Sequence, residues 1–306
     1  MKNSVKRTIA AILAVLTLGA CLILASCGKS GEKTVVKIGV CGANNNQWFA
    51  VQKVLDEQNA NIYIELVEFD AYNLPNEALN TGDIDLNAFQ HKAYLANDSK
   101  ANGYDLTAIG DTLIAPLSLY SKKYSSLDEL KAAAGSSSAK LLIGVPNDGT
   151  NLSRAIKLLE TAGLITVDPA AGFTPEISDV TSYLYNIEIS PVSANTLTAT
   201  LDDYAASTIN GTYAVPYGLV PSRDALIIEK QSEDGSNPYV NIIVARTADK
   251  DNATYKKIVE AYQTQLVAEY LLEAYKETFF PAFDYDSNYT VSENFVNEID
   301  SYKTAK

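Results

Sequence analysis

The sequence predicts an α/β fold with two lobes, each built on a largely parallel sheet that is covered by helices. Segments with the two-residue period of strands alternate along the chain with segments of helical period, which is typical of this class. The 306 residues, 47% of them hydrophobic, can fill one large core or two smaller ones. Two extended segments, one broken by Pro116 and one at 240–245, are candidates for chain crossings between lobes.

The first 26 residues have the layout of a secretory signal. A short basic region precedes an apolar run from Ile9 to Ala25, which is too short and too rich in small residues at its end to predict a membrane span. The run ends in Leu24-Ala25-Ser26-Cys27, which resembles the bacterial lipobox. This resemblance implies removal of residues 1–26, lipid on Cys27 and an extracytoplasmic protein anchored to the cell membrane. An uncleaved anchor helix is the alternative.

Residues 27–33 are polar and contain Gly and Ser, which predicts a tether between the membrane and the folded part. The three cysteines do not predict a disulfide. Cys21 lies in the signal segment and Cys27 is the lipidation candidate, so Cys41 remains alone. The fold must therefore be stabilised by core packing.

Residues 34–118 are expected to begin the first lobe. Apolar residues alternate as in strands over 35–40, 62–69 and 84–89. Helical spacing over 47–58, 74–79 and 92–101 lies between or after these strands, and Gly82 and Gly103 mark the ends of the last two helices. A long extended run over 106–120 then leads out of this lobe.

Residues 119–238 are expected to form the second lobe. Ser126 and Glu129 have the spacing of a capping box, which predicts a helix that begins there. The segment 132–138, with three alanines, Gly135 and three serines, is interpreted as a loop insertion. The later predicted elements are a strand over 141–145, a turn over 147–151, a helix over 152–162 ended by Gly163, and strands over 187–189 and 225–229.

Residues 239–306 are expected to return to the first lobe. They supply a strand over 240–245 and helices over 254–261 and 265–275. The last thirty residues are acidic and rich in tyrosine, and their pattern predicts no element.

Composition disfavours several functions. The formal net charge of −13 argues against nucleic acid as a partner. His91 is the only histidine, so no histidine cluster predicts a metal site, and no cofactor is predicted. Cys41 and His91 are the only nucleophile and base pair, about 50 residues apart, so the chain is not expected to be an enzyme. Asp83 and Asp85 are read as capping or solvated residues.

Four blocks of the sequence stand in order and at compatible spacing: Tyr72–Leu79 with Gly82–Lys92, Pro146–Arg154, Asn210–Ala214 and Pro238–Asn241. Together they resemble the methionine-binding lipoprotein family, the extracytoplasmic receptors of methionine ABC importers. The resemblance covers about residues 34–275. It implies a type II periplasmic-binding-protein fold that closes on a ligand in the cleft between its lobes. It also implies L-methionine as the ligand, with an ABC permease and its ATPase as partners on separate chains.

The resemblance further implies seven ligand-binding residues. In the family an aromatic and histidine group surrounds the methionine side chain, and an arginine with two asparagines holds the amino-acid backbone. Aromatic rings suit a thioether, and a guanidinium can grip a carboxylate through two parallel hydrogen bonds. The matching positions are Tyr72, Phe89, His91 and Tyr94 for the side chain, and Arg154, Asn210 and Asn241 for the backbone.

Alternatives remain open from the sequence. Taken singly, each of the seven residues also has a purely structural interpretation in the core, in a turn or at the surface. Trp48 either trims the pocket or packs in the core. A methionine-containing dipeptide, another apolar amino acid, or a surface lipoprotein without a transport role are the alternative functions. Binding is expected to fall below about pH 6 only if neutral His91 contacts the ligand.

Overall fold

The computed structural model describes residues 33–230, 237–276, 278–286 and 291–304. The predicted signal segment, the lipidation site Cys27 and all but the last residue of the tether lie outside these ranges. Within them, every helix is too short or too polar to cross a membrane.

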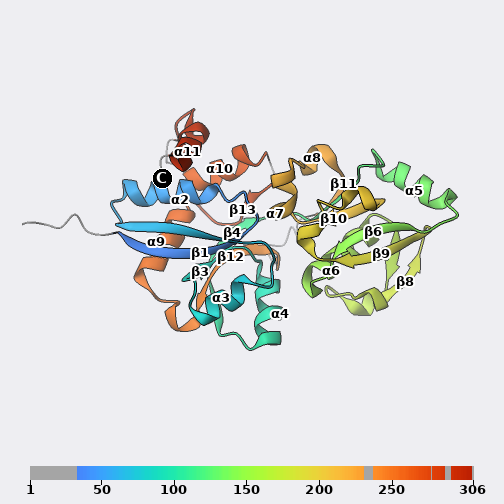
Figure 1. Cartoon of the computed structure of the whole chain (residues 1–306), viewed down its shortest axis with the longest axis horizontal. Helices are drawn as coiled ribbons and strands as arrows, with labels where there is room; N and C mark the ends of the chain where they lie inside the picture. The colour runs from blue at the N-terminus through green and yellow to red at the C-terminus, as the bar shows by residue number, and fades with distance from the viewer. Residues whose placement is uncertain (1–32, 231–236, 277, 287–290, 305–306) are drawn as a thin grey trace, which may run out of the picture. The chain divides into compact units, whose positions relative to one another are not determined.

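The first lobe is built on a mixed sheet (Figure 1). In the described residues its strands are β1 (Thr34–Cys41), β2 (Ile62–Phe69), β3 (Leu86–Asn87), β4 (Leu106–Ile114), β12 (Val240–Arg246) and β13 (Phe280–Pro281). They lie in the order β13-β4-β12-β3-β1-β2. β1 pairs with β3 in parallel, whereas β12 pairs with both β3 and β4 in antiparallel fashion. The prediction of largely parallel sheets was therefore wrong here, because the strand that leaves this lobe and the strand that returns to it are neighbours.

Helices pack on this sheet around a large apolar core. Trp48 is 2% exposed and its ring meets that of Tyr262 edge to face at 5.1 Å, so the ring packs in the core, although the residue also lines a hollow described below. The acidic tail contributes a helix that the sequence pattern did not predict, because a single buried side chain, Ile299, is its main apolar anchor. The helices are α2 (Gln47–Glu57), α3 (Pro75–Thr81), α4 (Lys92–Asn102), α9 (Ala253–Tyr262), α10 (Gln265–Ala274) and α11 (Phe295–Thr304).

The second lobe has its own mixed sheet and core. Its described strands are β5 (Ser118–Tyr120), β6 (Leu141–Pro146), β9 (Ile187–Val192), β10 (Ala206–Ile209) and β11 (Ala225–Ile228), in the order β11-β5-β10-β6-β9. β6 is parallel to β9 and β10, and β5 is antiparallel to β10 and β11. An antiparallel pair, β7 (Ile165–Val167) and β8 (Val180–Tyr183), was not predicted. The helices are α5 (Leu127–Ser136), α6 (Gly149–Thr161), α7 (Gly211–Ala214) and α8 (Pro221–Asp224).

The predicted loop insertion at 132–138 was wrong over most of its length. Helix α5 continues to Ser136, because alanines are strong helix formers and Ala134 is fully buried in the second core. The side chain of Ser126 accepts a hydrogen bond from the Glu129 N–H, as predicted. The low-complexity composition of this segment therefore did not reveal the helix, which is stabilised by one buried face.

The chain crosses between the two sheets twice. The first crossing lies between β4 and β5 and contains Pro116, and the second lies between β11 and β12. Strands of the first sheet therefore come from both ends of the described chain. The predicted lobe limit at 238/239 falls at the second crossing, whereas that at 118/119 lies inside β5, and both limits stay predictions.

Candidate functional site

A hollow lies where side chains of both lobes meet. The structure brings all seven predicted residues together around it: Tyr72, Phe89, His91, Tyr94, Arg154, Asn210 and Asn241. Five residues that were not predicted complete the lining: Gln90, Ala115, Asn151, Gly211 and Thr212.

Aromatic rings form one wall of the hollow. Tyr72 is the centre of the group, with its ring centroid 5.9 Å from Phe89, 6.2 Å from Tyr94 and 5.0 Å from Tyr213. Tyr213 belongs to the second lobe and was missed, although it lies in a block that carried the resemblance. Burial raises the pKa of all three tyrosines, so their hydroxyl groups stay neutral. The wall is apolar and uncharged.

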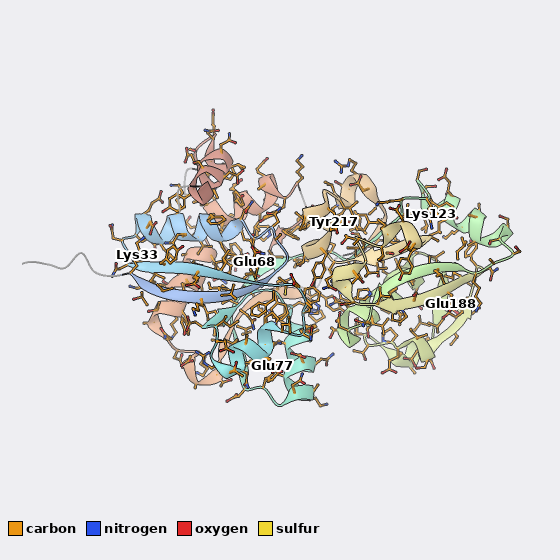
Figure 2. The ribbon with its side chains drawn as sticks, in the orientation of Figure 1. Lys33, Glu68, Glu77, Lys123, Glu188 and Tyr217 are labelled. Carbon is orange, nitrogen blue, oxygen red and sulfur yellow. The ribbon has the colours of Figure 1, made fainter. Side chains whose placement is uncertain are left out.

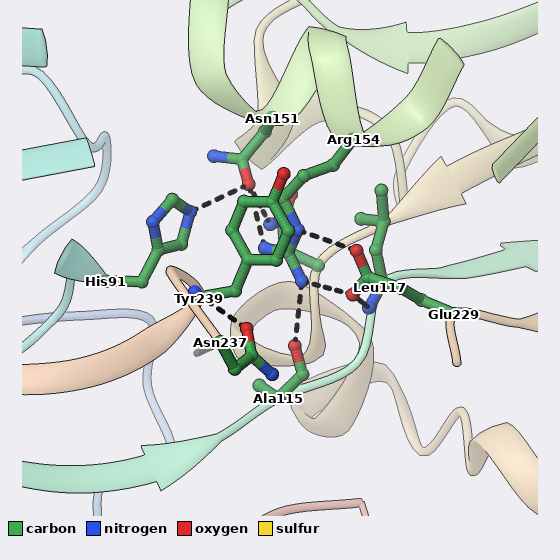
Figure 3. A network of polar contacts seen from close by, with 9 residues as sticks. His91, Ala115, Leu117, Asn151, Arg154, Glu229, Asn237 and Tyr239 are labelled. Carbon is green, nitrogen blue, oxygen red and sulfur yellow. Dashed lines mark hydrogen bonds and ion pairs between the residues drawn. The ribbon is translucent and has the colours of Figure 1, made fainter. Parts of the chain in front are cut away.

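His91 joins this wall to the polar side of the hollow. It caps the N-terminus of α4, where its Nδ1 accepts a hydrogen bond from the Tyr94 N–H at 3.1 Å. The ring proton is therefore on Nε2, which lies 3.5 Å from Oδ1 of Asn151 (Figure 3). Burial, and the nearby charge of Arg154, lower the pKa of His91 to about 3. The imidazole is neutral at physiological pH.

Asn151 is the centre of the polar wall, and sequence reasoning missed it. Its Oδ1 faces His91 and accepts from Nη1 of Arg154 at 3.2 Å (Figure 3). The same oxygen also accepts from Nδ2 of Asn210 at 3.0 Å. Helix α6 begins at Gly149 rather than Leu152, with Asp148 as its N-cap, which places Asn151 one turn before Arg154. The available signal was Asp148 at capping distance from Asn151.

Asp148 fixes the orientation of Asn151. Its Oδ1 accepts from the backbone N–H of Asn151 and from Nδ2 of the same residue, both at 2.9 Å. Burial raises the pKa of the Asp148 carboxyl, and the hydrogen bonds from Asn151 act in the opposite direction. With Nδ2 held by Asp148, Oδ1 of Asn151 must face the hollow.

Arg154 is held mainly by Glu229, which the sequence did not predict. Nε of Arg154 donates to Oε1 of Glu229 at 3.0 Å, and Nη2 donates to Oε2 at 2.5 Å (Figure 3). Nη2 also donates to the Ala115 carbonyl at 3.2 Å, and the Tyr239 ring covers the guanidinium at 4.4 Å. The two parallel hydrogen bonds that Arg154 was expected to donate to a ligand carboxylate are therefore donated to Glu229. One N–H of Nη1 has no acceptor among the described residues.

The two predicted asparagines offer further polar groups. Asn210 is 8% exposed, and its Oδ1 has no hydrogen-bond partner in the described part of the chain. Asn241 lies in β12, bridged to His91 through the backbone, and its side chain makes no hydrogen bond with a described residue. A buried acceptor without a partner is costly, so Oδ1 of Asn210 is suited to a ligand that donates hydrogen bonds.

Cys41 and the possible metal ligands were the sequence's candidates for covalent and metal chemistry. Cys41 is 3% exposed, its Sγ lies 3.8 Å from the Ala71 carbonyl, and burial raises its pKa, so the thiol stays protonated. No cluster of three or more His, Cys, Asp or Glu side chains is placed to hold a metal ion in the described ranges. The hollow is built to hold a small molecule with an apolar end and a polar end.

Comparison with known proteins agrees with this architecture. The family model described as NlpA lipoprotein matches residues 36–283. The chain is 41% identical over 251 residues to the D-methionine-binding lipoprotein MetQ of Escherichia coli strain K12, a match that covers 81% of this chain and 89% of that protein.

Solved structures give the same result for the fold. The crystal structure of the methionine-binding protein MetQ matches with a TM-score of 0.75 and 40% identity, over 82% of this chain and 98% of that one. A nutrient-binding protein from Burkholderia cenocepacia, bound to methionine, matches with a TM-score of 0.74 and 35% identity, over 81% and 100% of the two chains. The predicted two-lobed α/β fold of substrate-binding proteins is confirmed.

Proposed function

Because the chain belongs to the NlpA lipoprotein family, we propose that it captures methionine outside the cytoplasm and delivers it to an ABC importer. One observation carries the proposal: a single hollow has an aromatic wall on one side and, on the other, a buried acceptor and a guanidinium N–H that lack partners among the described residues. These groups are complementary to a thioether, an ammonium and a carboxylate.

The proposed pose uses each group once. The thioether lies against Tyr72, Phe89 and Tyr94, the ammonium donates to Oδ1 of Asn210, and the carboxylate accepts from Nη1 of Arg154 and from the Asn241 amide. Burial of a methionine side chain contributes about 1.5–3 kcal/mol, and each charge-assisted hydrogen bond about 1.5–3 kcal/mol. After ordering costs, this is compatible with affinities of about 1 μM to 1 nM.

A binding protein rather than an enzyme is supported by the site chemistry. The buried thiol of Cys41 stays protonated, and the neutral imidazole of His91 is held by Tyr94 and Asn151. Lipid on Cys27, and a permease with its ATPase on separate chains, complete the proposal. Its support is that the family and the MetQ relatives are described as lipoproteins.

A methionine-containing dipeptide is a second candidate, favoured by an adjoining hollow. This second hollow shares Phe89 and Asn241 with the first. Among the described residues, the buried Nε1 of Trp48 and Oδ1 of Asn44 on its lining have no hydrogen-bond partner. A donor and an acceptor of this kind match the C=O and N–H of a peptide group.

Isothermal titration of the purified protein, stripped of ligand by unfolding and refolding, tests the proposal. We expect one-to-one binding of L-methionine, tested beside D-methionine because both isomers carry the same three groups. Tighter binding of Gly-Met would favour the dipeptide, and binding of another apolar amino acid would change the ligand alone. If none of these ligands gave a heat of binding, the remaining interpretation would be a surface lipoprotein without a transport role.

A further inference from the structure

We infer that Glu229 sets the charge selectivity of the site, so that it selects zwitterions over carboxylates that lack an ammonium group. The inference rests on the proposed function and specifies its ligand class. Glu229 follows β11 directly, at the start of the second chain crossing, and meets the guanidinium of Arg154 with both carboxylate oxygens (Figure 3).

Glu229 is fixed from two sides. Besides the two bonds from Arg154, its Oε2 accepts from the backbone N–H of Leu117 at 3.0 Å, in the first crossing. The side chains of Arg154 and Glu229 are 3% and 16% exposed. Rotation of the carboxylate away from this position would leave three donors without an acceptor, two of them on a buried guanidinium. The pair therefore persists when a ligand enters.

This pairing limits what Arg154 can offer a ligand. A buried anion requires strong, preferably two-bonded, partners to offset its loss of hydration. Glu229 occupies the paired Nε and Nη2 donors, Ala115 takes the second hydrogen of Nη2, and Asn151 takes one hydrogen of Nη1. A ligand carboxylate can reach one N–H, which is a weak site for an anion.

The charges around the hollow lead to the same conclusion. Arg154 is balanced by Glu229, His91 is neutral, and the Asp148 carboxyl lies behind Asn151. A zwitterion adds no net charge, and its ammonium gives Oδ1 of Asn210 a partner. An anion without an ammonium adds negative charge near carboxylates and offers that oxygen at most a neutral donor, which is unfavourable on both counts.

The test compares methionine with its 2-hydroxy analogue, which keeps the thioether and the carboxylate but replaces the ammonium by a hydroxyl. Titration calorimetry measures both ligands on the full chain, on Glu229→Gln and on Glu188→Gln. Glu188 is a matched control, because it lies on β9 of the same lobe, is 54% exposed and is paired at 3.6 Å with Lys140 (Figure 2). Both variants remove one negative charge.

We expect the wild type to prefer methionine by at least about 100-fold, since like-charge juxtaposition costs several kcal/mol. Glu229→Gln should narrow this ratio by at least about tenfold, and Glu188→Gln should keep it. A ratio that is unchanged in a folded Glu229→Gln variant overturns the inference. So does a wild type that binds both ligands equally, a result that needs no variant.

Two further outcomes separate charge from other causes. Glu229→Asp keeps the charge, so it should keep the wild-type ratio of the affinities for methionine and its 2-hydroxy analogue. If Glu229→Gln and Glu229→Asp lowered this ratio equally, the cause would be packing and the inference would be overturned. If the wild type binds neither methionine nor the dipeptide, the proposed function fails. If it binds methionine but selectivity does not depend on Glu229, the present inference alone fails.

Discussion

The side chain of Asn151 shows how one residue can align several others. One carbonyl oxygen faces donors from Arg154, Asn210 and His91, which come from both lobes and from three segments of the chain. Because Nδ2 of Asn210 is used in this way, its Oδ1 turns to the hollow without a partner in the described residues. The free acceptor of the site is thus a consequence of how Asn151 is held.

Asn210→Ala tests this acceptor. We expect methionine binding to weaken by about 1.5–3 kcal/mol, because the ammonium loses a charge-assisted hydrogen bond. Stability should fall by only about 1 kcal/mol, since just one hydrogen bond within the protein, to Asn151, is lost. Titration calorimetry and urea unfolding measure the two effects. The control is Asn186→Ala, which also removes one hydrogen bond in the second lobe, to the Ser137 carbonyl. Equal affinity in both variants would exclude Asn210 as a ligand contact.

At the scale of elements, the ends of two helices build the site. His91 caps α4, so the residue that begins the helix also borders the hollow. Asp148 caps α6 and brings Asn151 and Arg154 onto one face. The sequence predicted α6 from Leu152 because Gly149, Thr150 and Asn151 are poor helix formers and Gly-Thr-Asn favours a turn. Arg154 was named because the resemblance implied it, whereas Asn151, in the same block, was placed in the turn and given no role.

The lowered pKa of the buried His91 predicts how the stability of the protein depends on pH. The folded pKa of about 3 lies below the usual 6.5, so between these values the unfolded chain binds the extra proton. The free energy of unfolding should therefore be unaffected by His91 above pH 6.5 and decrease as pH falls below it, by about 2 kcal/mol at pH 5. Ligand binding should stay constant from pH 8 to 5, because His91 remains neutral in the folded state.

Urea unfolding at pH 7.5, 6 and 5 measures this effect. Since His91 is the only histidine, His91→Asn should remove most of the decrease between pH 6.5 and 5 while keeping a residue that can cap α4. The comparison is between the slopes of the unfolding free energy against pH, so a general loss of stability in the variant does not affect it. The same slope in both proteins would show that His91 is not held neutral by its surroundings.

At the scale of the whole molecule, the sequence predicts the order of the helices and strands better than it predicts which of them are neighbours. Apart from β13 and α11 in the acidic tail, the strands and helices of the first lobe were predicted within a few residues, because periodicity and the glycines at helix ends are local signals. Pro116 marked one crossing correctly. The pair of Arg154 with Glu229, 75 residues later, follows from how the crossings meet and leaves no local pattern. The parallel prediction failed for a similar reason, since the neighbours of β12 depend on topology.

Two side-chain hydrogen bonds join the lobes near the hollow. The Asn97 side chain on α4 donates to the Thr150 hydroxyl on α6 at 3.2 Å, and the Tyr213 hydroxyl on α7 donates to the Asp70 carbonyl at 3.1 Å. Both bonds join segments of different lobes. If ligand capture requires closure of the lobes, these bonds contribute to the free energy of binding without touching the ligand.

The double variant Asn97→Ala, Tyr213→Phe tests this contribution, because it removes both bonds and keeps the aromatic ring beside Tyr72. With about 0.5–1.5 kcal/mol for each bond, methionine binding should weaken about five- to 150-fold. Small-angle scattering of the ligand-free variant should show a larger radius of gyration than that of the wild type. Asn102→Ala is the matched control, since Asn102 lies on the same helix and bonds only Asp98 within it. A double variant that binds as tightly as this control would mean that the two contacts form without any coupling to ligand capture.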